Sequence, residues 1–262
     1  MKVTLEFITG LAKEAGQILL DGLDDVHTLD YKGPTNIVTE VDKKAEDFIV
    51  GRIKDSFSDH TIIAEESGKS QGRQGKNWYI DPVDGTSNYA RGLPFFAISI
   101  GFEEDGLMRF GCVYDPVRNE CFSAERGKGA WLNDKIIHVS KTSKLIDAML
   151  VTGFPYNLDQ ANNNLGHFSD ILKEVHVVRR LGSAALDQVY IAAGRLDAYW
   201  EIGVESWDIA AGTLIVEEAG GKVTTLGGSD EYMVPPYAVL VSNGILHENL
   251  LAFFKNQWVS NN

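Results

Sequence analysis

The sequence of 262 residues contains no long hydrophobic run, and this absence sets a first limit on its class. A helix that crosses a bilayer needs about 20 mostly apolar residues in succession. The longest apolar stretch is FFAISIGF (95–102), and the first 20 residues alternate apolar and charged positions as in an amphipathic helix, not a signal peptide. We therefore expect a cytoplasmic protein without a membrane segment.

Basic residues are scarce, because 24 Lys and Arg stand against 37 Asp and Glu, which gives a formal charge of −13. No segment is rich in Lys or Arg, and the phosphate backbone of a nucleic acid would be repelled by such a surface. We therefore expect no nucleic-acid partner. The acidic balance is typical of a soluble protein, and it equally fits a protein that binds several divalent cations.

Cysteine is nearly absent, which excludes a disulfide framework. Cys112 and Cys121 flank VYDPVRNE (113–120), a predicted hairpin turn that would place them opposite each other. In a reducing compartment we expect two small buried thiols and not a disulfide. The six histidines form no HxxxH or Cys/His cluster, which argues against a zinc site.

Hydrophobic periodicity predicts an α/β fold of layered α+β type. The first part of the chain predicts helices at 5–19 and 45–57 and, over 60–125, short strands that include an antiparallel meander. From about residue 145, strands and helices alternate, with helices expected at 160–173, 183–193, 206–219 and 246–258. We expect an N-terminal half (1–144) with an antiparallel sheet and a C-terminal α/β half (145–262), packed as one globular unit.

Two aspartates stand three apart in WYIDPVDGTSNY (78–89), around a proline at the end of an apolar run. We expect Pro82 to end a strand, so that the following turn aims Asp81, Asp84 and the Val83 carbonyl at one point. Hard cations such as Mg²⁺ bind oxygens of this kind. A plain turn with Asx capping is the simpler alternative, whereas an EF-hand is excluded because its twelfth position would be Gly92.

Other acids also follow apolar segments. Glu65 and Glu66 come directly after a predicted strand, and Asp208 lies in the first turn of a predicted helix, where the dipole alone favours an acid by about 0.3–1 kcal/mol. Gly85 and Thr86 begin a segment whose backbone N–H groups could face an anion. The recurrence of acids at such positions indicates one shared site.

Together these segments resemble the inositol monophosphatase family of Mg²⁺-dependent, Li⁺-sensitive phosphatases. The matching segments occur in family order: NIVTEVDKKAE (36–46), AEESG (64–68), WYIDPVDGTSNYARGLPFFAISIGF (78–102), RRLGSAALD (179–187), AGRLDAYWEIG (193–203) and WDIAAGTLIVEEAGG (207–221). The resemblance implies an αβαβα sandwich, an active site between the two halves and a homodimer.

The resemblance also implies a role for particular residues in hydrolysis of a phosphomonoester by in-line attack of a metal-activated water. Two to three Mg²⁺ ions would be held by Glu65, Asp81, the Val83 carbonyl, Asp84 and Asp208. The attacking water would be oriented and deprotonated by Glu65, Thr86 and Asp42. The substrate would be contacted by Asp84, Gly85, Thr86, Ser183, Ala184, Glu201 and Asp208.

The substrate is less closely defined than the reaction. The match favours myo-inositol 1-phosphate and related small polyol or sugar monophosphates. Alternatives are fructose 1,6-bisphosphate, NADP(H) or another nucleotide, and histidinol phosphate. Positive residues that reach a second phosphate would distinguish them, and Arg179, Arg180 and Arg195 are nearby in the sequence. A non-catalytic binding protein is a third alternative. Asn36 replaces an aspartate common in the family, and Lys32 precedes it in the same loop.

Overall fold

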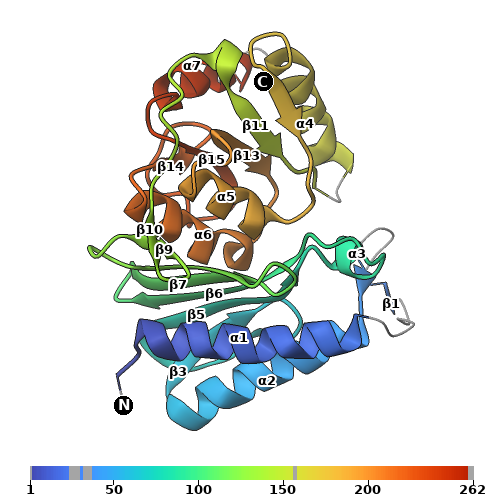
Figure 1. Cartoon of the computed structure of the whole chain (residues 1–262), viewed down its shortest axis with the longest axis vertical. Helices are drawn as coiled ribbons and strands as arrows, with labels where there is room; N and C mark the ends of the chain where they lie inside the picture. Colours follow the sequence, from blue (N-terminus) through green and yellow to red (C-terminus); the bar gives the residue numbers. More distant parts are fainter. Residues whose placement is uncertain (1, 24–29, 32–36, 156–157, 259–262) are drawn as a thin grey trace.

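The computed structural model describes residues 2–23, 30–31, 37–155 and 158–258, so Lys32 and Asn36 lie outside the described residues. Helices, a sheet, helices, a second sheet and helices follow one another as layers (Figure 1). The predicted αβαβα sandwich is therefore confirmed. The helices are α1 (Leu5–Gly22), α2 (Glu40–Ser56), the short α3 (Thr86–Tyr89), α4 (Leu158–Ile171), α5 (Ala184–Ala192), α6 (Ser206–Glu218) and α7 (His247–Trp258).

The larger sheet has eight strands in the order β10-β9-β8-β7-β6-β5-β3-β4. Neighbouring strands are antiparallel except for β3 and β5, which are parallel. Helices α1 and α2 cover one face of this sheet, and α5 and α6 cover the other (Figure 1). Its strands are β3 (His60–Ala64), β4 (Gly68–Lys69), β5 (Arg73–Asp84), β6 (Ala97–Glu104), β7 (Leu107–Asp115), β8 (Glu120–Glu125), β9 (Ala130–Leu132) and β10 (Lys135–Ile137).

The smaller sheet has five strands in the order β12-β11-β13-β15-β14, with parallel pairing on either side of β11. It lies between α5 and α6 on one side and α4 and α7 on the other (Figure 1). Its strands are β11 (Met149–Thr152), β12 (Val177–Arg179), β13 (Ala198–Ile202), β14 (Lys222–Thr225) and β15 (Ala238–Ser242). A separate ladder pairs β1 (Asp30–Tyr31) with β2 (Ile37–Val38). The boundary at 144/145 stays a prediction; it falls between β10 and the 3₁₀ turn Leu145–Asp147.

Strand β5 does not end before Pro82, so this part of the sequence prediction was wrong. The strand continues to Asp84, and its pairing with β6 shifts between Asp81, opposite Ser99, and Asp84, opposite Ala97. One extra residue on β5 is accommodated there as a bulge, a place where a proline without an N–H group costs no ladder bond. Residues three apart in a regular strand face opposite sides. The extra residue brings Asp81 and Asp84 to the same side.

The hairpin of β7 and β8 corrects a second expectation. Both cysteines are free and buried, as predicted. They are not directly opposite each other, because Cys112 pairs with Ser123 and Cys121 pairs with Tyr114. The thiols therefore meet on a diagonal between the two strands. Every helix in the described ranges is too short or too polar to cross a membrane.

Helix α6 lies unusually close to the larger sheet because glycines face it. A Cβ atom added at Gly111 would stand 2.8 Å from the Ala211 carbonyl oxygen, and one at Gly101 would stand 3.0 Å from the Ala210 Cβ. The helix is buried on nearly all sides from Ile209 to Val216, as expected for a helix between two sheets. This close contact sets the height of the first turn of α6, with Asp208, above the sheet.

We predict that Gly111→Ala lowers the free energy of unfolding by about 1–3 kcal/mol, because the added methyl group meets backbone atoms that cannot turn aside. The matched control is Gly51→Ala in α2, where an added Cβ contacts nothing within 4 Å. That control should raise stability by about 0.5–1 kcal/mol. Urea unfolding of both variants checks the pair, and equal effects would contradict this account of α6 packing.

Candidate active site

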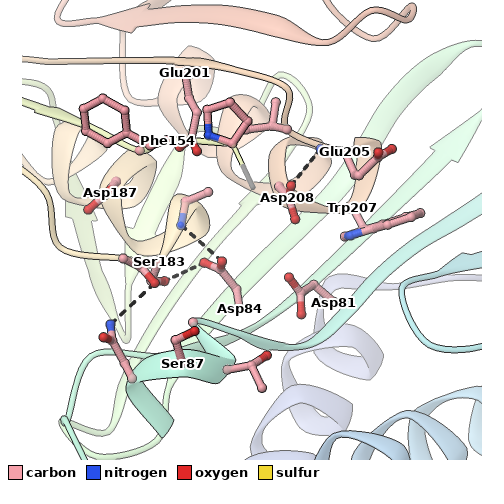
Figure 2. Close-up of a pocket in the computed structure, with 18 of the residues that line it drawn as sticks. Asp81, Asp84, Ser87, Phe154, Ser183, Asp187, Glu201, Glu205, Trp207 and Asp208 are labelled. Carbon is pink, nitrogen blue, oxygen red and sulfur yellow. Dashed lines mark hydrogen bonds between the residues drawn. The ribbon is translucent and has the colours of Figure 1, made fainter. Parts of the chain in front are cut away.

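One cavity of about 540 Å³ brings together every predicted site residue except Asp42. Its walls come from segments on both sides of the 144/145 boundary, as Figure 2 shows for ten labelled residues. Seven of the lining side chains are acidic: Glu65, Asp81, Asp84, Asp187, Glu201, Glu205 and Asp208. The cavity is thus a place where negative charge accumulates between the layers.

Asp81, Asp84 and Asp208 lie around a common space in Figure 2. Asp81 is buried, and its Oδ1 accepts a hydrogen bond from the Val83 N–H at 2.9 Å. Burial raises the pKa of Asp81 well above its usual value, and repulsion from Glu65, Asp84 and Asp208 raises it further. The acids therefore destabilise one another's charged forms as long as no positive charge lies between them.

Asp84 connects β5 to the start of α5. Its carboxylate accepts hydrogen bonds from the Ser183 hydroxyl, from Ala184 N–H at 3.1 Å and from Ala185 N–H at 2.6 Å. Burial raises the pKa of Asp84 to about 6, although these hydrogen bonds act in the opposite direction. Asp84 is buried at the end of β5, and its hydrogen bonds to the start of α5 stabilise the fold as well as the site.

Asp208 lies in the first turn of α6, as the sequence predicted. Its Oδ2 accepts a hydrogen bond from the Glu205 N–H at 2.7 Å, which leaves Oδ1 for another partner. Burial raises the pKa of Asp208, and repulsion from Asp84 adds to the effect. Helix α6 thereby presents an acid from the C-terminal part of the chain to the acids of β5.

Glu65 follows β3, and its N–H donates to the Ile80 carbonyl at 3.1 Å. The turn that carries it is held by Glu46, a buried residue of α2 that sequence reasoning missed. The Glu46 carboxylate accepts the N–H groups of Glu66 at 2.8 Å and Ser67 at 2.7 Å. The available signal was an acid placed within the apolar stripe of a predicted helix, where a charge needs a partner.

Thr86 and Asp42 are hydrogen-bonded, although Asp42 does not line the cavity. The Thr86 hydroxyl lies 3.0 Å from Asp42 Oδ1 and 3.0 Å from the Val83 carbonyl oxygen. It carries one proton and can donate to one of the two at a time. Asp42 is buried, and its Oδ2 accepts from the N–H and hydroxyl of Thr39. Burial raises the pKa of Asp42 despite these bonds.

Ser183, Ala184 and Glu201 line another part of the cavity wall. Ser183 caps α5, because its Oγ accepts the Leu186 N–H at 3.3 Å. Glu201, on β13, accepts a hydrogen bond from the Tyr199 hydroxyl at 2.7 Å. Burial raises the pKa of Glu201 to about 7.

Asp187 and Asn88 are site residues that sequence reasoning missed. Asp187 is buried in the same wall, and its Oδ1 has no hydrogen-bond partner among the described residues. Asn88 lines the cavity, and its side-chain N–H₂ donates to the carbonyls of Phe95 at 2.8 Å and Leu181 at 2.9 Å. It thereby fixes α3 against the turn that precedes Ser183.

Gly85 is required by its backbone conformation and by its surroundings. Its φ is +98°, a region that other residues rarely adopt. An added Cβ atom would stand 3.0 Å from the Phe95 carbonyl oxygen and 3.1 Å from that of Gly182. A side chain here would push α3 away from the neighbouring turn. Glycine at position 85 therefore lets α3 pack against that turn in the cavity wall.

The donor set fits divalent cations bound partly through water. Among the described residues, no three acidic, histidine or cysteine side chains form a group that could hold a metal by themselves. Mg²⁺ usually keeps several waters and binds through one or two carboxylates together with phosphate oxygens of the substrate. Buried acids that repel one another, open to a cavity, are suited to such hydrated cations.

The fold and this site define a layered α/β protein with a cavity lined by acids, and the comparisons identify its family. The chain belongs to the inositol monophosphatase family, whose sequence model matches residues 1–258. It is 41% identical over 255 residues to "Nus factor SuhB" of Pasteurella multocida, with 95% of each chain covered. It is 37% identical over 255 residues to "Inositol-1-monophosphatase" of Mesorhizobium japonicum, with 96% of each covered. The solved structure of an inositol monophosphatase from Anabaena matches with a TM-score of 0.87 and 39% identity, covering 96% of this chain and 95% of that one.

We predict a pH dependence of stability that is due to Glu201 in metal-free protein. Its pKa is about 7 when folded, against an ordinary value of 4.5. The folded state therefore binds the proton more tightly, and this stabilising contribution is complete below about pH 4.5 and lost as the pH rises through 7. Glu201→Gln should remove this part of the decline.

Urea unfolding between pH 4.5 and 8 in the presence of a chelator measures the effect. The control is Glu231→Gln in an exposed loop, whose curve should run parallel to that of the wild type. If the Glu201→Gln curve also ran parallel, the raised pKa of Glu201 would be wrong.

Proposed function

We propose that the protein is a Mg²⁺-dependent phosphomonoesterase that acts on myo-inositol 1-phosphate and related small polyol or sugar monophosphates. The observation that supports this most is the convergence of Glu65, Asp81, Asp84 and Asp208 on one cavity of about 540 Å³. Carboxylates in such a place are costly without cations. A cavity of this size suits a small sugar phosphate.

Two Mg²⁺ ions would be held by residues that share Asp81: one by Glu65, Asp81 and the Val83 carbonyl, the other by Asp81, Asp84 and Asp208. A third ion would bind near Glu65. Bound Mg²⁺ supplies Lewis acidity, which lowers the pKa of water and offsets negative charge on the phosphate oxygens. Asp81 and Asp84 can both serve because the bulge of β5 turns them to one side.

The chain itself would position the attacking water. If the Val83 carbonyl oxygen binds a cation, the Thr86 hydroxyl donates its hydrogen bond to Asp42, since one hydroxyl proton cannot be shared between both acceptors. The Thr86 oxygen then accepts a hydrogen bond from one O–H of the water and orients it, and Glu65, with the Thr86/Asp42 pair, takes up the one proton that the water loses as it attacks. The N–H groups of Gly85 and Thr86 would hold the phosphate.

The leaving group of the substrate would be contacted by the part of the cavity wall that carries Ser183, Ala184 and Glu201. Glu201 can accept hydrogen bonds from vicinal hydroxyls, and Ser183, Ala184 and Asp84 stand beside it. Of the three arginines that could contact a second phosphate, Arg180 belongs to the described cavity wall. Arg195 instead binds Glu120 through two nitrogens at 2.6 and 2.5 Å. Arg180 is therefore the one of the three that is placed to contact a second phosphate.

A second candidate is a binding role, favoured by the name Nus factor SuhB that the Pasteurella multocida relative carries. The cavity supports the enzyme more directly, because a binding protein has no need of buried acids that repel one another. We further propose a homodimer, as the resemblance implied, and a location in the cytoplasm.

We predict phosphate release from myo-inositol 1-phosphate with Mg²⁺ and inhibition of this release by Li⁺. For fructose 1,6-bisphosphate, NADP and 3′-phosphoadenosine 5′-phosphate, kcat/KM should be lower by at least about tenfold, which corresponds to about 1.4 kcal/mol less stabilisation of the transition state. A colorimetric phosphate assay on each substrate measures this. Preference for a bisphosphate or nucleotide would keep the reaction and replace the substrate. No release from any substrate would favour the binding role.

We predict that Asp81→Asn lowers kcat by at least about 100-fold, because the change weakens both proposed cation sites. It should also abolish the rise in melting temperature that Mg²⁺ gives the wild type. The matched control is Asp105→Asn in the exposed turn between β6 and β7, whose φ of +54° asparagine tolerates. Retained turnover with a normal Mg²⁺ effect in Asp81→Asn would refute the proposed ligand set.

A further inference from the structure

The two cysteines lie in contact at a place that the proposed function does not use. Cys112 on β7 and Cys121 on β8 have their Sγ atoms 3.6 Å apart. Both belong to the hydrophobic core beneath α1 and α2, and neither lines the active-site cavity. Their register places them on a diagonal of an antiparallel pair, where side chains on the same face can still reach each other.

A second cavity, of about 560 Å³, is lined by one of the two cysteines. Cys121 lines this cavity and Cys112 does not. Among the lining residues Lys13, Asn133 and Asp134 are exposed at the surface, so the cavity opens to solvent. A small solute in this cavity therefore comes up to Cys121, which is 3% exposed, whereas Cys112 is fully buried behind it in the core.

Two neighbours, the Cys112 thiol and Lys13, favour the thiolate form of Cys121. The hydrogen bond from Cys112 lowers the pKa of Cys121, and the Lys13 ammonium group lowers it further although burial opposes both. The same hydrogen bond and burial raise the pKa of Cys112. Glu6 and Asp134 are the acids that line the cavity. Because the thiolate is the nucleophile, Cys121 is the member suited to attack.

We propose that Cys112 and Cys121 form a peroxide-reactive dithiol, in which Cys121 attacks hydrogen peroxide and Cys112 resolves the product into a disulfide. The Cys121 sulfur forms a bond to one peroxide oxygen, the O–O bond breaks, and the departing hydroxide takes a proton to become water. The Cys112 sulfur then attacks the sulfenic sulfur, the S–O bond breaks, and a second water leaves. The two thiols lose two electrons and two protons, and the peroxide is reduced to two waters.

The diagonal arrangement makes this oxidation reversible. The sulfur atoms must close from 3.6 Å to about 2.05 Å to bond. Diagonal neighbours have more widely separated backbones than directly opposite ones, so the bond stores strain. Strained disulfides are reduced easily. The site therefore acts as a redox-sensitive pair and not as a permanent cross-link.

The wild-type protein tests the proposal directly. Treatment with a small excess of hydrogen peroxide at pH 7 should lower the intact mass by about 2 Da, the loss of two hydrogens on disulfide formation. A thiol count in denaturant should fall from two to none, and dithiothreitol should restore both. An unchanged mass with both thiols retained, or added oxygen without loss of hydrogen, would overturn the proposal. Neither result depends on phosphatase activity.

Variants assign the order of the steps. In Cys112→Ser, dimedone should trap a sulfenic acid on Cys121, whereas Cys112 in Cys121→Ser should stay unlabelled under the same conditions. Lys13→Met should slow the oxidation of Cys121 by about threefold or more, since each unit of thiol pKa changes the thiolate fraction about tenfold. Lys44→Met, an exposed lysine of α2 outside this cavity, is the matched control. Faster labelling of Cys112 than of Cys121 would show that the assigned order is wrong.

Discussion

Several carboxylates must be held together in one buried space against their own repulsion, and much of the structure follows from this requirement. Asp81, Asp84 and Asp208 come from two elements on different sides of the cavity, and each has its pKa raised by burial, with further contributions from neighbouring acids. Like charges held in one cavity repel one another, so they would move apart if they were carried on a flexible loop. The scaffold therefore places them on a strand and on the first turn of a helix, both fixed by packing.

Three local devices meet that requirement. The bulge at Pro82 turns two aspartates of β5 to the same side. The N–H groups and the hydroxyl at the start of α5 bind the Asp84 carboxylate and join the two parts of the chain at the site. Glycines 101 and 111 let α6 approach the sheet, so that its first turn reaches the cavity. Each device constrains position at a point where a shift of the backbone would separate the acids.

The sequence was sufficient to predict the layers and the acids, because both leave local patterns. Alternating apolar residues predict the strands, and Asp81, Asp84, Glu65 and Asp208 each follow an apolar segment. Features that depend on pairing between distant segments were not predictable. The bulge is a matter of register with β6, and the diagonal of Cys112 and Cys121 is a matter of register between β7 and β8. Asn88 and Asp187 act through partners or walls far away in the sequence, and nothing near them marks that role. Glu46 is marked by its place in an apolar helical stripe, but its partners are also distant in the sequence.

The central proposal is that the acids of this cavity bind Mg²⁺ and that they repel one another when it is absent. Isothermal titration of Mg²⁺ at pH 6.5, in two buffers that differ in ionisation enthalpy, tests this most directly, since it counts both the ions bound and the protons released. The account predicts two or more Mg²⁺ per chain and a net release of protons, because the proposed ligands Asp81, Asp84 and Asp208 have raised pKa values and must lose protons to bind a cation. Absence of binding, or binding without proton release, would contradict it.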